Sequence, residues 1–483
     1  MSPEAQRTLD VEITPRAGGV RELLVVALPM VVSHACDTVM TFTDRVFLSR
    51  LGSDEMNAAM SGGLTSFMVM TFFIGLIGYT TALVAQYLGA GRKDRCAVAT
   101  TQAMIVCLAA YPLILASRPL VFLAFDLSGV SAGQLEYQKE YFGILVYASI
   151  VGLTRTCLSG FFSGIGRTRM VMVAACVSMV ANVGLNYVLI FGKLGLPALG
   201  IRGAAYGTII GGLLGLFVLA AAYLWPTNCR EFQIARSWRF DREAMGNLLR
   251  FGYPAGIEMF LNVLAFTAMI FTFQSHSPVT ATAATIVFAW DMVSFVPLIG
   301  MQIGVMSLVG RYMGARSPDT AHRSAMSGLK IGWIYSAVIF LLFICFPNSL
   351  VAAFQPGTHD PVFEQAFPIA VFMVRTASLY VLIEAIVAVF VGALRGTGDT
   401  FWTMCISVSL HWLLVPILYV MLHRLGMSAQ SAWVALVLTF FAFSHLFYLR
   451  YRSGKWREIR VVPSTEELIA TDHDQDFHGT PDL

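Results

Sequence analysis

A few polar residues interrupt the long apolar stretches of this sequence, and their side chains are of the kinds that bind cations and protons. In MTFTDRVFLSRLG, residues 40–52, Asp44 and Arg45 stand among Phe, Val, Met and Leu. In VANVGLNYVLIFG, Asn182 and Asn186 are four residues apart and share one helical face. Their amide oxygens can coordinate a hard cation beside a carboxylate, but such pairs also form ordinary interhelical hydrogen bonds.

Acidic residues recur along the first apolar stretch. Asp37 and Asp44 are seven residues apart, so they share a helical face, and His34 lies one turn before Asp37. Asp44 follows the start of the stretch by about twenty residues, which places it in the half of the membrane far from that start. It is either an interfacial, hydrated residue or a functional carboxylate; the apolar VFLS that follows favours function.

Other polar residues lie at similar depth in the second half of the chain. Charge inside a bilayer costs several kcal/mol unless water, a partner or protonation relieves it, so such residues are candidates for function. Glu258 and Asn262 are one turn apart, and Glu384 lies within LYVLIEAIVAVFVG. The candidate proton or substrate groups are Asp37, His34, Glu258, Asn262, Asp291 and Glu384. His411 is also polar at this depth, and Arg155 and Arg375 have partners that the sequence does not identify.

The elements that must position these residues are membrane-spanning helices. Hydrophobic residues make up 57% of the 483 and charged residues only 13%, too few to cover a soluble protein of this length. Runs of about twenty apolar residues predict spanning helices. The expected segments are 23–49, 57–88, 97–117, 138–164, 169–192, 203–225, 247–274, 281–313, 326–347, 366–394, 400–422 and 430–449. The sixth has glycine at 203, 207, 211 and 215, a small-residue ridge for close packing, and Thr208 lies beside it.

The distribution of Lys and Arg predicts the orientation. With a cytoplasmic N-terminus, 23 of them fall in inner segments or at inner helix ends, against seven outside: Arg45, Arg50, Arg118, Lys139, Lys193, Arg202 and Arg424. This asymmetry predicts an even number of spans in the cytoplasmic membrane, with both termini in the cytoplasm.

The chain contains an internal repeat. VAQYLGAG at 84–91 returns as VGRYMGAR at 309–316, GIGRT at 164–168 as GTGDT at 396–400, and Pro29 matches Pro254. Six spans per half make this a parallel repeat about an axis along the membrane normal, a frequent plan in transporters. Asp44 corresponds to Met269 and Glu384 to Gly152, so the carboxylates were not duplicated with the scaffold.

We therefore predict an all-α polytopic membrane protein with five parts. These are a polar N-terminal segment 1–20, a six-helix lobe 21–225, a basic cytoplasmic loop 226–246, a second six-helix lobe 247–450 and a disordered tail 451–483. The eight cysteines lack CxxC spacing and are expected to be reduced. No GxxxxGK[ST] or HExxH motif occurs, which disfavours an ATPase or a metal-dependent membrane enzyme. GxSxG occurs once, as GVSAG at residues 129–133, in the segment between two predicted spans rather than after a strand. The asymmetric carboxylates disfavour a symmetric pore.

The chain resembles the multidrug and toxic compound extrusion (MATE) family across about residues 21–452. The resemblance is carried by LPMVVSHACDTVMTFTDRVFLSRLG, VAQYLGAG, NVGLNYVLIFGKLGLPALGIRGAAYGT, FVPLIGMQIGVMSLVGRYMGA and GALRGTGDT. It implies twelve helices in two six-helix lobes around a central cavity. It also implies export of organic, often cationic compounds, driven by inward Na⁺ or H⁺.

The resemblance also implies roles for particular residues. Asp44 is similar to the family's first-helix acid, and Asn182, Asn186 and Thr208 match positions that complete a cation site for Na⁺. Some members have Asp at the position of Asn186, so the site here would hold one carboxylate. In the second lobe Asn262 stands where some branches have an acid, with Glu258 one turn earlier, and Glu384 matches a family acid.

The expected function is a cation-coupled antiporter that exports cationic or amphipathic organic compounds by alternating access. No cofactor other than Na⁺ or H⁺ as coupling ion is expected. Its partners would be small organic substrates and the lipid bilayer, with no nucleic acid and a monomeric state. Export of a lipid-linked saccharide or another endogenous metabolite is the alternative, although mid-helix arginines that would hold pyrophosphate are few.

Overall fold

The computed structural model describes residues 17–128, 130–355 and 359–463, and its regular elements are helices. The first lobe contains α2 (Val20–Ser49), α3 (Ser53–Gly78), α4 (Thr80–Gly89), α5 (Lys93–Ala116), α6 (Arg118–Asp126), α7 (Ala132–Tyr147), α8 (Ser149–Gly164), α9 (Thr168–Phe191) and α10 (Ile201–Tyr223). The short helices α11 (Pro226–Glu231) and α12 (Ile234–Ser237) follow. The second lobe contains α13 (Arg242–Gln274), α14 (Pro278–Gly314), α15 (Pro318–Cys345), α16 (Pro347–Ala352), α17 (Pro361–Thr397), α18 (Thr400–Tyr419), the π-helix η1 (Val420–Arg424), α19 (Ala429–Arg452) and the 3₁₀-helix η2 (Lys455–Glu458).

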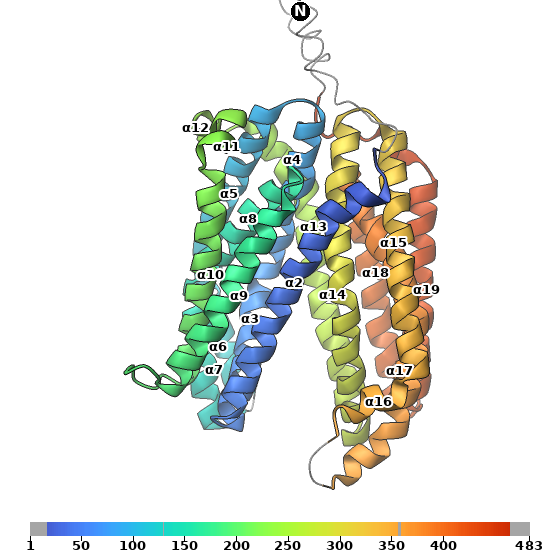
Figure 1. Cartoon of the computed structure of the whole chain (residues 1–483). Coiled ribbons are helices and arrows are strands. Elements are labelled where there is room, and N and C mark those ends of the chain that lie inside the picture. The colour runs from blue at the N-terminus through green and yellow to red at the C-terminus, as the bar shows by residue number, and fades with distance from the viewer. Residues whose placement is uncertain (1–16, 129, 356–358, 464–483) are drawn as a thin grey trace, which may run out of the picture.

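The prediction of twelve spans is confirmed. Eleven helices or continuous helix pairs in the described ranges are long and apolar enough to cross a membrane. The pair α7 and α8, bent by 46°, forms a twelfth. Two lobes of six spans result, coloured blue to green and yellow-green to red in Figure 1.

The internal repeat appears in space as a reciprocal contact between the lobes. A Cβ built on Gly89 would lie 1.8 Å from the carbonyl oxygen of Arg311, and one built on Gly314 would lie 2.0 Å from that of Gln86. Gly314 is the repeat equivalent of Gly89, and Arg311 is that of Gln86. The same glycine contact therefore occurs twice, as the predicted axis between two parallel halves requires.

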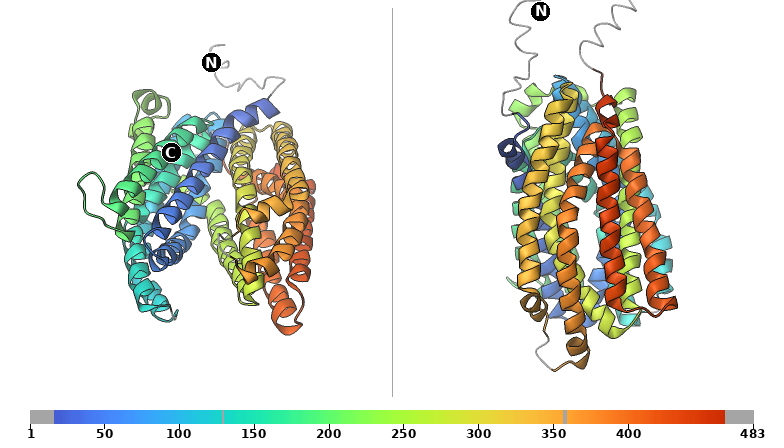
Figure 2. Two further views of the ribbon diagram at one scale, coloured as in Figure 1. Left: turned by 60° about the horizontal axis from the view of Figure 1, so that its bottom comes forward. Right: turned by 90° about the vertical axis from the view of Figure 1, so that its right-hand side faces the viewer.

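The lobes pack closely at the end of the bundle where both described chain ends lie. A Cβ on Gly304 of α14 would lie 2.7 Å from Cβ of Ala27 on α2, and one on Gly256 of α13 would lie 2.5 Å from the carbonyl oxygen of Phe72 on α3. Only glycine permits backbones to approach this closely. Towards the opposite end, the ribbons of α2 and α14 diverge (Figures 1 and 2).

Two predicted boundaries are corrected. Helix α13 begins at Arg242 rather than at residue 247, because the Asp241 side chain accepts a hydrogen bond from the Ala244 N–H and caps the helix. The tail is not disordered from residue 451. Trp456 is 2% exposed, and Val462 is 4% exposed in a hydrophobic cluster with first-lobe residues. Residues 464–483 of the predicted disordered tail and residues 1–16 of the polar N-terminal segment lie outside the described ranges.

Candidate functional site

The first-lobe residues singled out from the sequence form one cluster where α2, α9 and α10 meet. The Asn186 side-chain amide donates a hydrogen bond to Oδ1 of Asp44. The Thr208 hydroxyl donates to Oδ2 of the same carboxylate at 3.3 Å, and the Asn182 amide donates to that hydroxyl at 3.2 Å. Both asparagines are buried and Asp44 is half-buried. Three helices thus converge on one carboxylate.

The glycine ridge on α10 positions this cluster. A Cβ at position 207 would lie 1.8 Å from Oδ1 of Asn186, and one at position 211 would lie 3.0 Å from Cβ of Asn182. Gly207 and Gly211 therefore let α9 approach α10 closely enough for both amides to be buried between them. The predicted packing role of these glycines is confirmed.

Two oxygens of the cluster lack a hydrogen-bond donor. Oδ1 of Asn182 and Oδ1 of Asn186 are both buried and have no hydrogen-bond partner in the described structure. A buried acceptor without a donor is costly, so amide oxygens in the same cluster as a carboxylate suit an incoming cation. Oδ1 of Asn186 lies against Gly207 of α10, and rotation about χ2 would turn this oxygen towards Asp44 in place of the amide nitrogen.

Tyr141 on α7 is a member of this cluster that sequence reasoning missed. It is buried, interacts with the Thr208 hydroxyl, and lies within electrostatic range of Asp44. The sequence contains sixteen tyrosines, and nothing in the local pattern distinguishes this one.

Asp37 and His34 belong to a different place. Nη2 of Arg155 on α8 lies 2.9 Å from Oδ1 of Asp37, and the two side chains are 29% and 35% exposed. Both line a cavity of about 300 Å³ between the lobes, together with His34, whose buried Nε2 has no hydrogen-bond partner among the described residues. Met259, Gln302 and Arg395 line the same cavity from the second lobe. Asp37 and Asp44 lie close together on α2, but Asp37 faces the cavity between the lobes and Asp44 faces α9 and α10.

Glu258 and Asn262 have separate partners. Oε2 of the buried Glu258 lies 2.9 Å from Nη2 of Arg395, which makes Arg395 a further residue that sequence reasoning missed. The Asn262 amide donates to Ser407 on α18 at 2.7 Å. These two candidates thus connect α13 to α17 and to α18, respectively.

Asp291 and Glu384 form a second carboxylate site deep in the second lobe. The Tyr380 hydroxyl donates a hydrogen bond to Asp291, and Glu384 follows Tyr380 by one helical turn on α17. Both acids are buried and interact electrostatically with each other. Oε2 of Glu384 has no hydrogen-bond partner in the described part of the chain. Two adjacent buried carboxyls favour a shared proton or a bound cation.

The remaining candidates have simpler settings. Arg45 and Arg375 are exposed. His411 Nδ1 lies 2.9 Å from the Ser407 carbonyl oxygen, and its ring packs against Phe443. In the described structure, none of these three residues forms a hydrogen bond with either carboxylate site.

A comparison with protein-family models decides the family. The model described as MatE matches residues 29–188 and 254–420, which is more than half of the chain. The chain belongs to the MATE family. One matched segment falls in each of the two lobes. A MATE protein is a membrane transporter, which agrees with the predicted class.

Relatives and solved structures of similar length support this assignment. The chain is 25% identical over 459 residues to a probable multidrug resistance protein NorM of Thermotoga maritima, covering 93% of this chain and 95% of the relative. It is 27% identical over 404 residues to the multidrug resistance protein PmpM of Pseudomonas aeruginosa, covering 81% of each. Its fold is similar to that of a MOP-superfamily transporter from Pyrococcus furiosus, with a TM-score of 0.83, 18% identity, and 95% and 99% of the two chains covered. The predicted two-lobe MATE fold is confirmed.

Proposed function

We propose that this MATE protein exports organic compounds across the cytoplasmic membrane in exchange for inward Na⁺ or H⁺. The names of its relatives support multidrug efflux. The observation that carries the coupling is the Asp44 cluster, in which a carboxylate accepts a hydrogen bond from Asn186 and the buried amide oxygens of Asn182 and Asn186 lack donors among the described residues. This set can hold a Na⁺ ion, or Asp44 can take a proton.

Coupling would arise from the different cost of the Asp44 charge in different lobe arrangements. An uncompensated carboxylate inside the first lobe is costly, whereas a bound cation or proton removes that cost. Asp44 lies where α2, α9 and α10 of this lobe meet, so ion binding would favour one packing of these three helices. Differential binding of ion and substrate to two lobe states then gives antiport.

The cavity between the lobes is the proposed substrate site. Its ion pair between Asp37 and Arg155 is partly exposed, so the carboxylate is accessible from the cavity. A cationic amphipathic compound could displace Arg155 as the partner of Asp37 while its apolar part contacts Met259 and Ile303. Export of a lipid-linked saccharide is less favoured, because Arg155 and Arg395 each have a carboxylate partner and leave little free positive charge for pyrophosphate.

The orientation completes the proposal. The excess of arginines at the end of the bundle that carries both termini supports a cytoplasmic location for that end. Because the lobes are packed together there, the arrangement would be closed to the cytoplasm. We propose a monomer, since each chain contains both carboxylate sites and the cavity.

The test is ethidium efflux in vesicles with Na⁺ and H⁺ gradients imposed separately. We expect one gradient to drive export and Asp44→Asn to reduce it at least a hundredfold, while the amount of protein in the membrane stays unchanged. Asp126→Asn, which changes an exposed acid paired with Lys139, is the matched control and should retain export. Wild-type efflux by the Asp44 variant would refute its coupling role, and absence of transport under both gradients would favour another substrate.

A further inference from the structure

A large groove on the outer surface of the second lobe is separate from both carboxylate sites. It has a volume of about 920 Å³ and is lined by parts of α15, α17, α19 and η2. Its long walls are apolar and include Leu329, Trp333 and Phe441. Trp333 and Phe441 are 49% and 46% exposed, so the groove opens to the surroundings of the bundle rather than to the space between the lobes.

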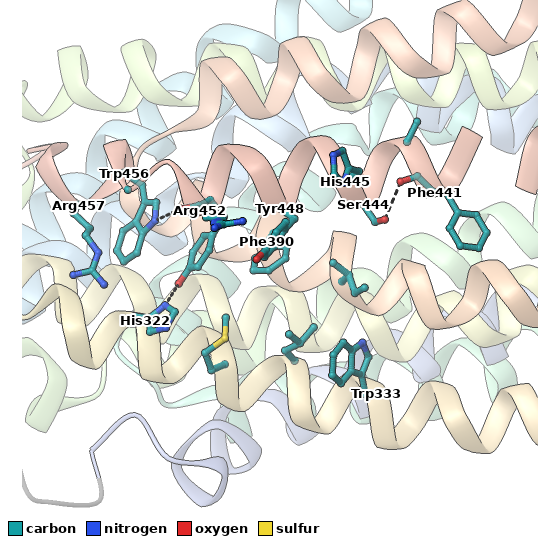
Figure 3. Close-up of a pocket in the computed structure, with 16 residues that line it drawn as sticks. His322, Trp333, Phe390, Phe441, Ser444, His445, Tyr448, Arg452, Trp456 and Arg457 are labelled. Carbon is teal, nitrogen blue, oxygen red and sulfur yellow. Dashed lines mark hydrogen bonds between the residues drawn. The ribbon is translucent and has the colours of Figure 1, made fainter. Parts of the chain in front are cut away.

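The arginines of the groove lie at one end. Figure 3 shows Arg452, Trp456 and Arg457 at that end, and Trp333 and Phe441 towards the other. The sixteen lining residues include two arginines and two histidines but no acid. Arg457 is paired with Asp319 at 2.8 Å. Arg452 is exposed and has no hydrogen-bonding or ion-pairing partner for its side chain within the described ranges.

An aromatic stack makes the charged end rigid. The Tyr451 ring lies between those of Phe390, at 4.7 Å, and Trp456, at 5.0 Å, and its hydroxyl lies 3.0 Å from Nδ1 of His322. The Trp456 indole donates to the Tyr451 carbonyl oxygen at 2.8 Å, which holds the chain after α19 against the bundle. The site is therefore preformed, and a ligand would pay little to order it.

The dimensions of the groove match one leaflet of a membrane. Along α19 the distance from Phe441 to Arg452 is about 16 Å at 1.5 Å per residue. Half of the hydrocarbon thickness of a bilayer is about 15 Å. A positive headgroup site at the end with the chain termini, and an apolar trough reaching to about mid-membrane, fit one lipid lying along the helices.

We propose that this groove binds a phospholipid with a negatively charged headgroup from the leaflet that faces the chain termini. Arg452 contacts the headgroup, and Leu329, Trp333 and Phe441 contact the acyl chains. The charge excess selects an anionic lipid over a zwitterionic one, and basic grooves between helices at the cytoplasmic side suit such headgroups. The leaflet is the cytoplasmic one if the orientation proposed above holds; the lipid preference does not depend on it.

The test is native mass spectrometry of the purified full chain with equal amounts of phosphatidylglycerol and phosphatidylcholine. We expect wild type to retain phosphatidylglycerol preferentially and Arg452→Gln to lower that preference about fivefold, the effect of one arginine near a membrane surface. Arg21→Gln is the matched control, because Arg21 is exposed at the same end of the bundle but outside the groove. It should leave the preference unchanged.

A second variant tests the groove without changing its charge. Ala442→Trp places an indole in the trough, and we expect it to reduce retention of both lipids while Arg452 is intact. Equal retention of the two lipids by wild type, or the wild-type preference in both Arg452→Gln and Ala442→Trp, would overturn the proposal. A mass that shows a second copy of the chain, lost in Ala442→Trp, would also overturn it by assigning the groove to a dimer.

Discussion

Nη2 of Arg155 on α8 donates a 2.9 Å hydrogen bond to Oδ1 of Asp37 on α2. The pair joins two helices of the first lobe at the wall of the cavity between the lobes. It gives Arg155 the partner that the sequence does not identify, and it separates Asp37 from the Asp44 cluster. Because both side chains are about one-third exposed, the pair is available to a substrate and contributes little to stability.

A double-mutant cycle on Asp37 and Arg155 should give a small coupling energy for unfolding and a larger effect on transport. We expect Arg155→Gln and Asp37→Asn to couple by about 0.5–1 kcal/mol in thermal unfolding. We expect Arg155→Gln alone to tighten ethidium binding severalfold, because it leaves the Asp37 carboxylate free for a cation. Asp126→Asn with Lys139→Gln is the control cycle at an exposed pair, where ethidium binding should not change. Unchanged ethidium affinity in Arg155→Gln would contradict the substrate role of Asp37.

A second carboxylate in the Asp44 cluster should strengthen Na⁺ binding. Asn186→Asp would place two acids side by side, and only a bound cation or a proton relieves their repulsion. We expect half-maximal Na⁺ stimulation of efflux at about tenfold lower Na⁺, and lower thermal stability when Na⁺ is absent. Asn57→Asp, at an exposed amide on α3, is the control. If Na⁺ dependence is the same in both variants, Na⁺ does not bind at this cluster.

The glycine ridge allows a test of the cluster that leaves its polar residues in place. Gly207→Ala would force Cβ to within 1.8 Å of Oδ1 of Asn186, so the amide or the helix must shift. We expect a loss of about 1–3 kcal/mol of stability and a marked loss of ion-driven efflux. In Gly184→Ala the new Cβ meets no atom within 4 Å, so this control on α9 should be neutral or slightly stabilising. Equal ion-driven efflux by Gly207→Ala and Gly184→Ala would show that transport does not depend on the position of the Asn186 amide.

Acid should weaken the ion pairs at the end of the bundle that carries the chain termini. Burial works to raise the pKa of Asp241, but the Ala244 N–H and the Arg95 guanidinium outweigh it and hold this pKa below its ordinary value. Asp241 therefore contributes stability that is complete above its unfolded pKa of about 3.9 and is lost as the pH falls through its lower folded pKa.

Thermal unfolding from pH 6 to pH 3 measures this contribution. Asp241→Asn keeps a good helix cap but removes the charge. We expect it to cost about 1.5–3 kcal/mol at pH 6 and to lose less stability than wild type on acidification. Asp319→Asn, whose residue is highly exposed, is the control and should follow the wild-type pH profile. A variant at position 241 with the same acid sensitivity as wild type would rule out this pair as the cause.

The sequence by itself determined the spans, the repeat and the local geometry of single helices. A bilayer core admits only long apolar helices of this kind, so their number and approximate bounds follow from hydropathy. The repeat follows from two motifs and a proline at nearly equal spacing, and the pairing of Asn182 with Asn186 on one face follows from helical periodicity. Each of these properties depends either on residues that are close together in the chain or on similar motifs that recur along it.

The tertiary structure alone decided which polar groups meet. Asp37 and Asp44 share one helix, yet one faces Arg155 on α8 and the other faces α9 and α10. The partnership of Glu258 with Arg395 likewise depends on how α13 and α17 pack. These contacts join residues more than a hundred positions apart, and the relative rotation and depth of helices that bring them together come from close packing rather than from any local pattern.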